Sequence, residues 1–290
     1  MIAVASRTQA KADEYSDLFN CEGIVGYKNL IDRKDIDAIY MPLPTGLHEE
    51  WVLKALEAGK HLLIEKSLAM NYVSAQQMVT LAKEKSLLIM ENFMFLYHGQ
   101  HQFVKDLIAK GEIGDIRCFR SSFGFPPLEK DNFRYNKALG GGALLDAAAY
   151  TIRASQLFLG NDLKVQAASL NNYGQEVDVY GGGFLKTNNG SFAEVAFGFD
   201  NYYQCNYEIW GSKGKITAKR AFTPGDDFTP TITLENKAEQ FDYEIDADNH
   251  FVNILNEFKR CVSENDMQSK YQEVLNQARL IQEFREKANG

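Results

Sequence analysis

Short apolar runs alternate with amphipathic stretches through residues 1–95, and this alternation limits the possible folds more than any other feature. Each run is too short for a helix and is bounded by polar or turn residues, so each indicates a buried strand. The runs are residues 2–5, 37–41, 62–64 and 87–90. Amphipathic helices are expected between them at 49–58 and 71–85, with Asn71 as the N-cap of the second. Apolar strands separated by helices predict a parallel sheet that is covered on both faces.

The carboxyl ends of parallel strands meet at one edge of a sheet, and ligands bind at that edge in folds of this class. The residues that follow the four runs are therefore candidates for a binding site. They are Ser6 and Arg7 after the first run, Pro42, Leu43, Pro44 and Thr45 after the second, Glu65 and Lys66 after the third, and Glu91 and Asn92 after the fourth.

The pattern changes after residue 95, where strands of alternating polarity predominate. They are expected at 117–125, 164–170, 177–186, 191–199, 203–210, 215–219, 229–235 and 240–245. Turn signals between several of them predict an open antiparallel sheet, and helices are expected at 142–159, 250–263 and 270–287. We divide the chain into a parallel-sheet domain at 1–95 and an α+β domain at 96–290, whose C-terminal helices are free to pack back on the first domain.

Charge and composition exclude several classes of function. The net charge of −8 arises largely at 224–248, which holds eight acids and one base, so the rest of the chain shows no basic stripe for nucleic acid. No apolar run approaches the roughly 18 residues of a membrane span, and the N-terminus lacks the pattern of a signal peptide. The four cysteines form no Cys-x-x-Cys pair, and His98 and His101 have no third ligand nearby. We expect a cytoplasmic protein without a metal, a membrane or a nucleic-acid partner.

Two groups of residues could perform chemistry. Lys66 follows a buried strand, where it could donate a proton or hydrogen bond to a carbonyl group, although a surface lysine explains the same position. Asp146, Tyr150 and Arg153 share one face of the helix that follows Gly140-Gly141-Gly142. The glycines permit close approach to a ligand, and the N–H groups at the helix N-terminus favour an anion. A structural hydrogen-bond network accounts equally well for this spacing. A second triplet, Gly181-Gly182-Gly183, is expected to mark a bulge in a strand.

These segments resemble the Gfo/Idh/MocA family of NAD(P)-dependent sugar and cyclitol oxidoreductases. Glu65-Lys66-Ser67 matches the family's E-K-P motif except at Ser67, and the segment from Pro42 to His48 is similar to its P-N-x-x-H loop. The stretch from Asn132 to Arg134 and then from Gly140 to Asp146 is similar to the part of the family that closes over the nicotinamide. Tyrosine at position 150 is typical of the dihydrodiol dehydrogenase branch and of sugar ketoreductases.

The resemblance implies a Rossmann-like first domain and hydride transfer between NADP(H) and a sugar, nucleotide-sugar or cyclitol-like alcohol or ketone. Tyr150 would give a proton to the alkoxide, Lys66 would lower the pKa of that tyrosine, and Asp146 would position the substrate or orient Lys66. The residues expected to contact the cofactor are Ser6, Arg7, Thr8, Pro42, Leu43, His48, Glu65, Lys66, Asn92 and Arg134. Because a hydroxyl and an arginine suit a 2′-phosphate, Ser6-Arg7-Thr8 favours NADP over NAD, although NAD is possible. A homodimer or higher homo-oligomer through the antiparallel sheet is expected.

One departure from the family concerns the beginning of the sequence. The family's first strand leads into a G-x-G-x-x-G turn that binds the diphosphate, and no such turn occurs in this sequence. Met1 lies directly before what resembles the family's second strand, so we expect the first strand-turn-helix unit to be lacking. This leaves two hypotheses, an active NADP-dependent oxidoreductase and a catalytically silent relative that binds sugars or forms dimers.

Overall fold

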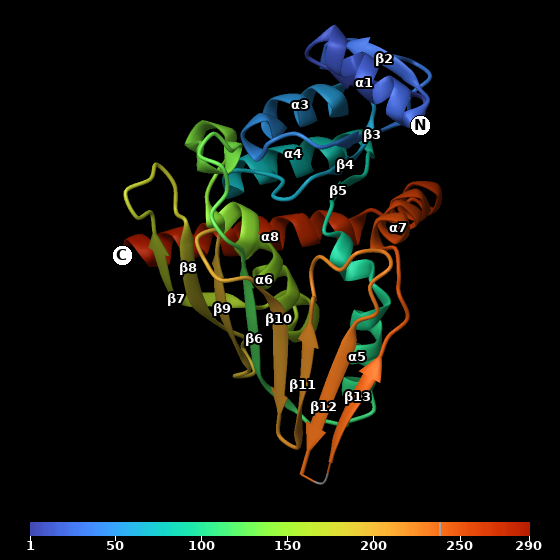
Figure 1. The fold of residues 1–290 in the computed structure, drawn as a ribbon. Helices are drawn as coiled ribbons and strands as arrows, with labels where there is room; N and C mark the ends of the chain where they lie inside the picture. The colour runs from blue at the N-terminus through green and yellow to red at the C-terminus, as the bar shows by residue number, and fades with distance from the viewer. Residues whose placement is uncertain (238) are drawn as a thin grey trace.

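Two small parallel sheets make up the N-terminal part of the molecule (Figure 1), a computed structural model that describes residues 1–237 and 239–290. β1 (Ala3–Ser6) pairs with β2 (Glu22–Val25), and β3 (Ala38–Met41), β4 (His61–Ile64) and β5 (Ile89–Glu91) form the second sheet in that order. The predicted parallel strands are confirmed. They do not form one sheet, because no strand in the described residues pairs with both β1 and β3.

Helices connect these strands, as the sequence predicts. They are α1 (Gln9–Phe19), α2 (Tyr27–Ile31), α3 (Thr45–Glu57) and α4 (Tyr72–Lys85). Asn71 is the N-cap of α4, since its side-chain oxygen accepts a hydrogen bond from Ser74 N at 2.9 Å. α3 begins four residues earlier than expected, directly after Pro44, so that it includes His48.

A large, mainly antiparallel sheet forms the second part of the molecule, as predicted. Its strands are β6 (Ile116–Gly124), β7 (Lys164–Asn171), β8 (Tyr180–Lys186), β9 (Phe192–Gly198), β10 (Gln204–Gly211), β11 (Gly214–Lys219), β12 (Thr231–Asn236) and β13 (Gln240–Glu244). They lie in the order β13-β12-β11-β10-β6-β9-β8-β7, and β6 and β9 are the one parallel pair among these described strands. The sheet therefore brings the C-terminal ends of β6 and β9 to the same edge.

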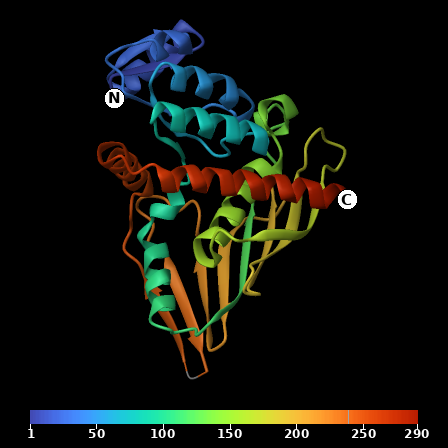
Figure 2. The ribbon, with the colours of Figure 1, turned by 180° about the vertical axis from the view of Figure 1, so that it is seen from behind.

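Helices cover one face of this sheet, and Figure 2 shows α5 (Gly99–Ala109), α6 (Ala143–Leu159) and α8 (Gln268–Asn289) in front of it. The remaining helices are η1 (Met94–Tyr97), η2 (Phe133–Tyr135), η3 (Lys137–Leu139) and α7 (His250–Glu264).

The second glycine triplet, Gly181-Gly182-Gly183, lies in β8 and pairs regularly, so the bulge predicted there is wrong. The register instead shifts between Val165 and Ala167 of β7. A Cβ atom at Gly183 would overlap the ring of Phe284, and the glycine therefore lets α8 approach the sheet.

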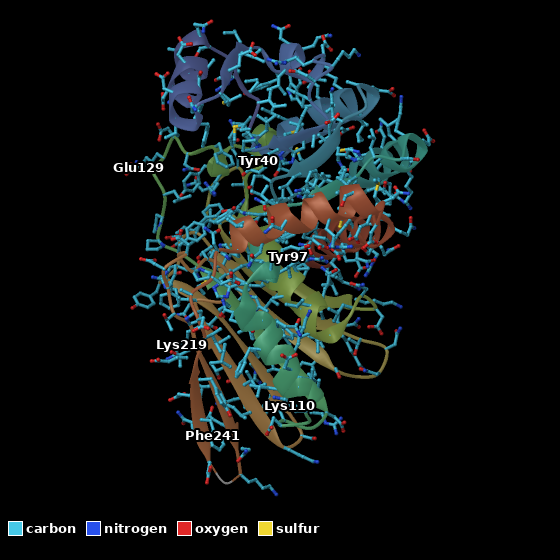
Figure 3. All side chains as sticks on the ribbon, turned by 90° about the vertical axis from the view of Figure 1, so that its right-hand side faces the viewer. Tyr40, Tyr97, Lys110, Glu129, Lys219 and Phe241 are labelled. Carbon is cyan, nitrogen blue, oxygen red and sulfur yellow. The ribbon has the colours of Figure 1, made fainter. Side chains whose placement is uncertain are left out.

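α8 lies between the two parts of the molecule and contacts both (Figure 1). Tyr271 donates a hydrogen bond from Oη to Leu87 O, 2.6 Å away, which fixes α8 to the segment before β5. Figure 3 shows the same arrangement from the side, with Tyr40 in the N-terminal part, Tyr97 beside the C-terminal helices and Phe241 far down the sheet. The described residues include no helix long and apolar enough to cross a membrane.

Candidate active site

Lys66, Asp146 and Arg134 form a charged cluster where the two parts of the molecule meet. Lys66 follows β4, and its ammonium forms an ion pair with Asp146 Oδ1 and donates to Asp146 O at 3.1 Å. Arg134 Nε donates to the other oxygen, Asp146 Oδ2, at 2.7 Å. The side chains of Lys66 and Asp146 are only 9% and 15% exposed. Burial raises the pKa of Asp146, but Lys66 and Arg134 outweigh it and hold the pKa below its usual value, so the carboxylate stays charged.

The segment that carries Lys66 is held by several elements. Ser67 Oγ donates to Leu145 O at 2.9 Å, and Leu68 N donates to Glu91 Oε1 at 2.7 Å. The buried His48 ring places Nδ1 3.1 Å from Ser67 O and Nε2 2.7 Å from Leu43 O. His48 thus joins the loop after β3 to the loop after β4, and it does not line the cavity described below. These contacts fix the backbone from which Lys66 extends.

Tyr150 is buried beneath this cluster in an aromatic cage. The rings around it are Phe93, Phe95, Phe123 and Phe222, with centroids 5.0 to 6.0 Å away. Its hydroxyl donates to Met94 Sδ at 3.9 Å, and Lys66 Nζ lies 4.8 Å from its ring centroid. We expected Lys66 to lower the pKa of Tyr150, but burial, with a smaller contribution from Asp146, raises this pKa. The ammonium of Lys66 is paired with Asp146, whose own charge raises this pKa, so burial of the phenol decides the direction.

A cavity of about 430 Å³ opens beside the cluster, within the range of small-molecule sites. The predicted residues Pro42, Leu43, Glu65, Lys66, Arg134 and Asp146 line it, together with Tyr40, Pro44, Thr45, Phe133, Gly140, Gly141 and Leu145. Asn92 lies behind this wall, where its Nδ2 donates to Glu65 Oε1 at 2.5 Å. Thr45, at the strand end after β3, lies at the cavity as the strand-end rule predicts, whereas Phe133 was missed because an apolar side chain alone does not indicate a site.

The anion contact predicted at the N-terminus of α6 is wrong. The helix N-terminus is capped by the chain's own Asp178, which accepts hydrogen bonds from Leu144 N to Oδ2 at 2.6 Å and from Ala143 N to its main-chain oxygen at 2.8 Å. A negative charge already occupies this end of the helix, so it is not available to a ligand. Arg153 pairs with Glu273 of α8 at 2.6 Å and does not line the cavity with Asp146.

Ser6, Arg7 and Thr8 lie at the end of β1, and none of them lines the cavity. Thr8 is the N-cap of α1, and its Oγ1 accepts from Lys11 N at 3.4 Å. Arg7 is exposed, and its guanidinium has no hydrogen-bond or ion-pair partner within residues 1–237 and 239–290. It is a free cation at the carboxyl end of a parallel strand.

Comparison with known proteins identifies the family that shares this architecture. Residues 1–93 match the model of the oxidoreductase family with an NAD-binding Rossmann fold, and residues 101–217 match the GFO/IDH/MocA C-terminal domain. A dTDP-3,4-didehydro-2,6-dideoxy-alpha-D-glucose 3-reductase of Saccharopolyspora spinosa is 42% identical over 263 residues, which cover 90% of this chain and 79% of that protein. The chain belongs to the Gfo/Idh/MocA oxidoreductase family. The resemblance identified from the motifs is thereby confirmed.

Other Gfo/Idh/MocA members are similar over most of their length. The dTDP-sugar 3-reductase of Actinomadura kijaniata is 39% identical over 285 residues, 98% of this chain and 86% of that protein. The crystal structure of KijD10, a 3-ketoreductase from A. kijaniata in complex with NADP and TDP-benzene, superimposes with a TM-score of 0.95 at 38% identity and covers 99% of this chain and 89% of that one. KijD10 has also been crystallised with a lysine replaced by alanine and with a tyrosine replaced by phenylalanine.

Proposed function

We propose that this oxidoreductase uses NADPH to reduce a keto group on a nucleoside diphosphate-linked deoxy sugar. The observation that carries the proposal is the Lys66–Asp146–Arg134 cluster, which lies on the wall of a ligand-sized cavity with Tyr150 directly below. The 3-reductases named above act on dTDP-linked keto sugars by name, and they match this chain over nearly its whole length. A D-xylose 1-dehydrogenase (NADP⁺) of Haloferax volcanii is a more distant relative at 31% identity.

The residues present fit a nicotinamide cofactor. Pro42, Leu43 and Pro44 give one wall of the cavity an apolar surface suited to a flat ring, while Lys66 and Arg134 supply positive charge. Asn92 Oδ1 is buried without a hydrogen-bond partner among the described residues, next to Glu65 of the cavity wall, although Asn92 does not itself line the cavity. The free guanidinium of Arg7 suits the 2′-phosphate that distinguishes NADP from NAD. We assign Ser6, Thr8 and Glu65 to the same cofactor-binding surface, with His48 supporting its loops.

The chain's own residues would supply the proton and the orientation. When bound, the nicotinamide of NADPH supplies the hydride to the carbonyl carbon. Tyr150 keeps its proton because burial raises the pKa of its phenol. The hydroxyl donates its hydrogen bond to Met94 Sδ, and a thioether sulfur is a weak acceptor. The hydroxyl can therefore leave the sulfur for an alkoxide oxygen at little cost, although Tyr150 lies below Lys66 and does not itself line the cavity. Lys66, held by Asp146, keeps a positive charge beside the same oxygen and stabilises the charge that develops there.

The cluster also bears on the alternative of a catalytically silent module. Three charged side chains held together by charge-assisted bonds cost desolvation free energy, and a module that only binds sugars or forms dimers does not need them. Their retention beside Tyr150 favours the enzyme.

We also propose a homodimer through the uncovered face of the large sheet. That face carries Trp210, which is half exposed, with Arg120 5.1 Å from its ring centroid and paired to Glu194. A surface with an aromatic side chain and charges of both signs can be complementary to itself across a twofold axis. Light scattering should give twice the chain mass, and Trp210→Glu should give the monomer.

We place the protein in the cytoplasm, which fits its four free thiols, and cell fractionation would check this.

Turnover tests the function directly. The protein should consume NADPH with a dTDP-linked 3-keto deoxy sugar, and it should consume it more slowly with the sugar that lacks the nucleotide. Oxidation of free D-xylose with NADP⁺ is the comparison that the distant relative suggests. The proposal would be overturned if millimolar NADPH neither binds nor is consumed with any of these substrates.

A further inference from the structure

Glu91 touches the segment that carries Lys66, although it does not line the substrate cavity. It is the last residue of β5, and its Oε1 accepts the N–H of Leu68 at 2.7 Å. Leu68 follows Lys66 by two residues, and Ser67 between them is fixed to α6 through Leu145 O. Lys66, Ser67 and Leu68 are therefore held from two sides, by α6 through Asp146 and Leu145 and by β5 through Glu91.

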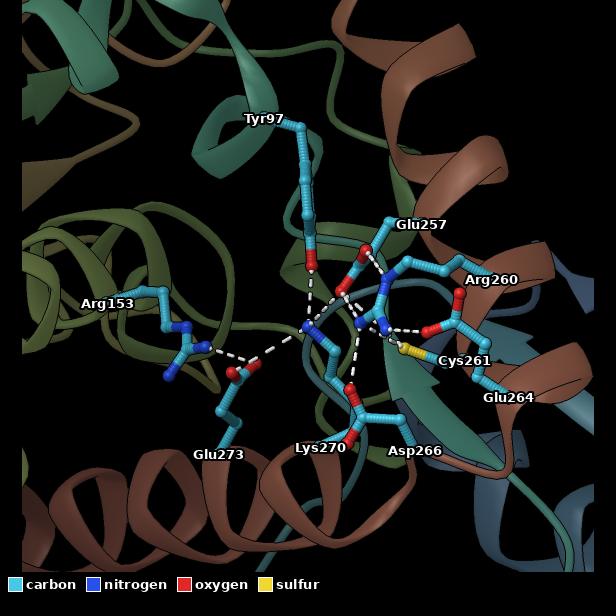
Figure 4. A network of polar contacts seen from close by, with 9 residues as sticks. All are labelled: Tyr97, Arg153, Glu257, Arg260, Cys261, Glu264, Asp266, Lys270 and Glu273. Atoms are coloured by element: carbon cyan, nitrogen blue, oxygen red, sulfur yellow. Dashed lines mark hydrogen bonds and ion pairs between the residues drawn. The ribbon is translucent and has the colours of Figure 1, made fainter.

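On another side, Glu91 faces a small cavity of about 10 Å³, roughly the space that one water molecule needs. The other polar groups that line this cavity are Tyr97, Arg153, Lys270 and Glu273. Figure 4 shows how they are engaged. Lys270 Nζ donates to Tyr97 Oη at 3.0 Å and pairs with Glu257 Oε1 at 3.0 Å, while Arg153 pairs with Glu273 at 2.6 Å. In the part of the chain that the structure describes, no ion pair reaches the carboxylate of Glu91.

Charges of both signs surround Glu91. Burial raises the pKa of Glu91 to about 7, the Leu68 N–H bond and the charges of Arg153 and Lys66 lower it, and Glu273 raises it. Lys270 is a cation whose pKa is raised, but it pairs with Glu257 and Glu273 rather than with Glu91. The pKa of Tyr97 is raised, so its phenol is neutral near neutral pH. The carboxyl group thus changes its charge in the range where the enzyme would work.

We propose that Glu91 is a positioning residue of the hydride-transfer site, which holds Lys66 against Asp146 through the N–H of Leu68 and does so more firmly as a carboxylate than as a neutral acid. A hydrogen bond to an ionised acceptor is roughly twice as strong as one to a neutral acceptor. The proposal rests on the proposed reductase for its effect on turnover, but its effect on the segment can be measured without substrate.

Glu91→Gln separates the charge from the hydrogen bond, because the amide oxygen can still accept from Leu68 N while remaining neutral at every pH. Amide hydrogen exchange at Leu68, corrected for its intrinsic pH dependence, should become slower between pH 6 and 8 in the unmodified protein. In Glu91→Gln it should show no such change. Equal pH dependence in the two proteins would overturn the proposal whether or not the chain reduces sugars.

Turnover supplies the second measurement. Glu91→Gln should match the unmodified enzyme below pH 6, where both side chains are neutral, and should be about tenfold slower above pH 8. Glu49→Gln is the matched control, since Glu49 Oε2 accepts a hydrogen bond from Ser74 Oγ at 2.6 Å and Glu49 does not line the substrate cavity, and its rate ratio should stay near one. A pH-independent ratio for Glu91→Gln overturns the proposal, whereas absence of turnover in the unmodified protein overturns only the proposed function.

Discussion

Lys66 and Asp146 are 80 positions apart in the sequence, yet the lysine ammonium contacts both the carboxylate and the main-chain oxygen of Asp146. The first contact pairs opposite charges, and the second ties the lysine to the first turn of α6. Because α6 packs on the large sheet and Lys66 follows β4, this one pair joins the two parts of the molecule at the proposed site.

Lys66→Ala should lower turnover by about 100-fold or more, because it removes the cation beside the reacting oxygen. The loss should appear in the rate of hydride transfer under saturating NADPH, measured in a single turnover. Lys54→Ala is the control, since Lys54 is an exposed lysine paired with Glu50 on α3 and should leave the rate unchanged. A Lys66→Ala enzyme with a nearly normal single-turnover rate would remove Lys66 from the mechanism.

Tyr150→Phe should lower turnover by about 100-fold while changing the free energy of unfolding by no more than about 1 kcal/mol. The hydroxyl has a single weak acceptor, Met94 Sδ, so its removal leaves the aromatic cage filled. Because its pKa is raised, Tyr150 stays protonated throughout the neutral range before the cofactor binds. Its ionisation should therefore cause no change of the rate with pH in that range. Denaturant unfolding and initial rates from pH 6 to 9 measure the two effects.

Arg7→Ser should weaken NADPH binding by about 10- to 100-fold and leave NADH binding nearly unchanged. The physical reason is that a 2′-phosphate gains a charge-assisted bond from the free guanidinium, whereas a ribose hydroxyl does not. Fluorescence titration with both cofactors measures the ratio. Arg117→Ser, at an exposed arginine on β6, serves as the control. If both cofactors lost affinity equally, Arg7 would not be the residue that distinguishes them.

Local patterns were enough to predict most of the elements and part of the site. The cap at Asn71 and the boundaries of α6 depend on neighbours in the sequence, and they were predicted correctly. The rule that ligands bind at strand ends placed Lys66 at the site, and the proximity of Asp146 followed from the resemblance to the family. β2 was missed because Glu22 and Gly23 interrupt its short apolar run.

Long-range packing decided the features that the sequence did not predict. Asp178 caps α6 from 34 positions away, and nothing local distinguishes it from other acids in polar loops. The rise in the pKa of Tyr150 comes from phenylalanines of separate segments, among them Phe93, Phe123 and Phe222. A helical spacing shows which side chains share a face, but it does not show what is packed against that face or how much water it excludes.

Glu91→Gln should also change stability with pH, in the direction opposite to its effect on turnover. The pKa of Glu91 is raised to about 7 in the folded protein, so the folded state binds more protons than the unfolded state between the usual value of 4.5 and 7. The unmodified protein therefore loses stability as pH rises through this window, by at most about 3 kcal/mol, and the glutamine variant does not. Thermal unfolding of both proteins at pH 5 and pH 8 should show the variant gaining relative stability at pH 8, where its turnover is expected to be slower. If stability and turnover instead changed in the same direction, Glu91 would act on activity only through the stability of the fold.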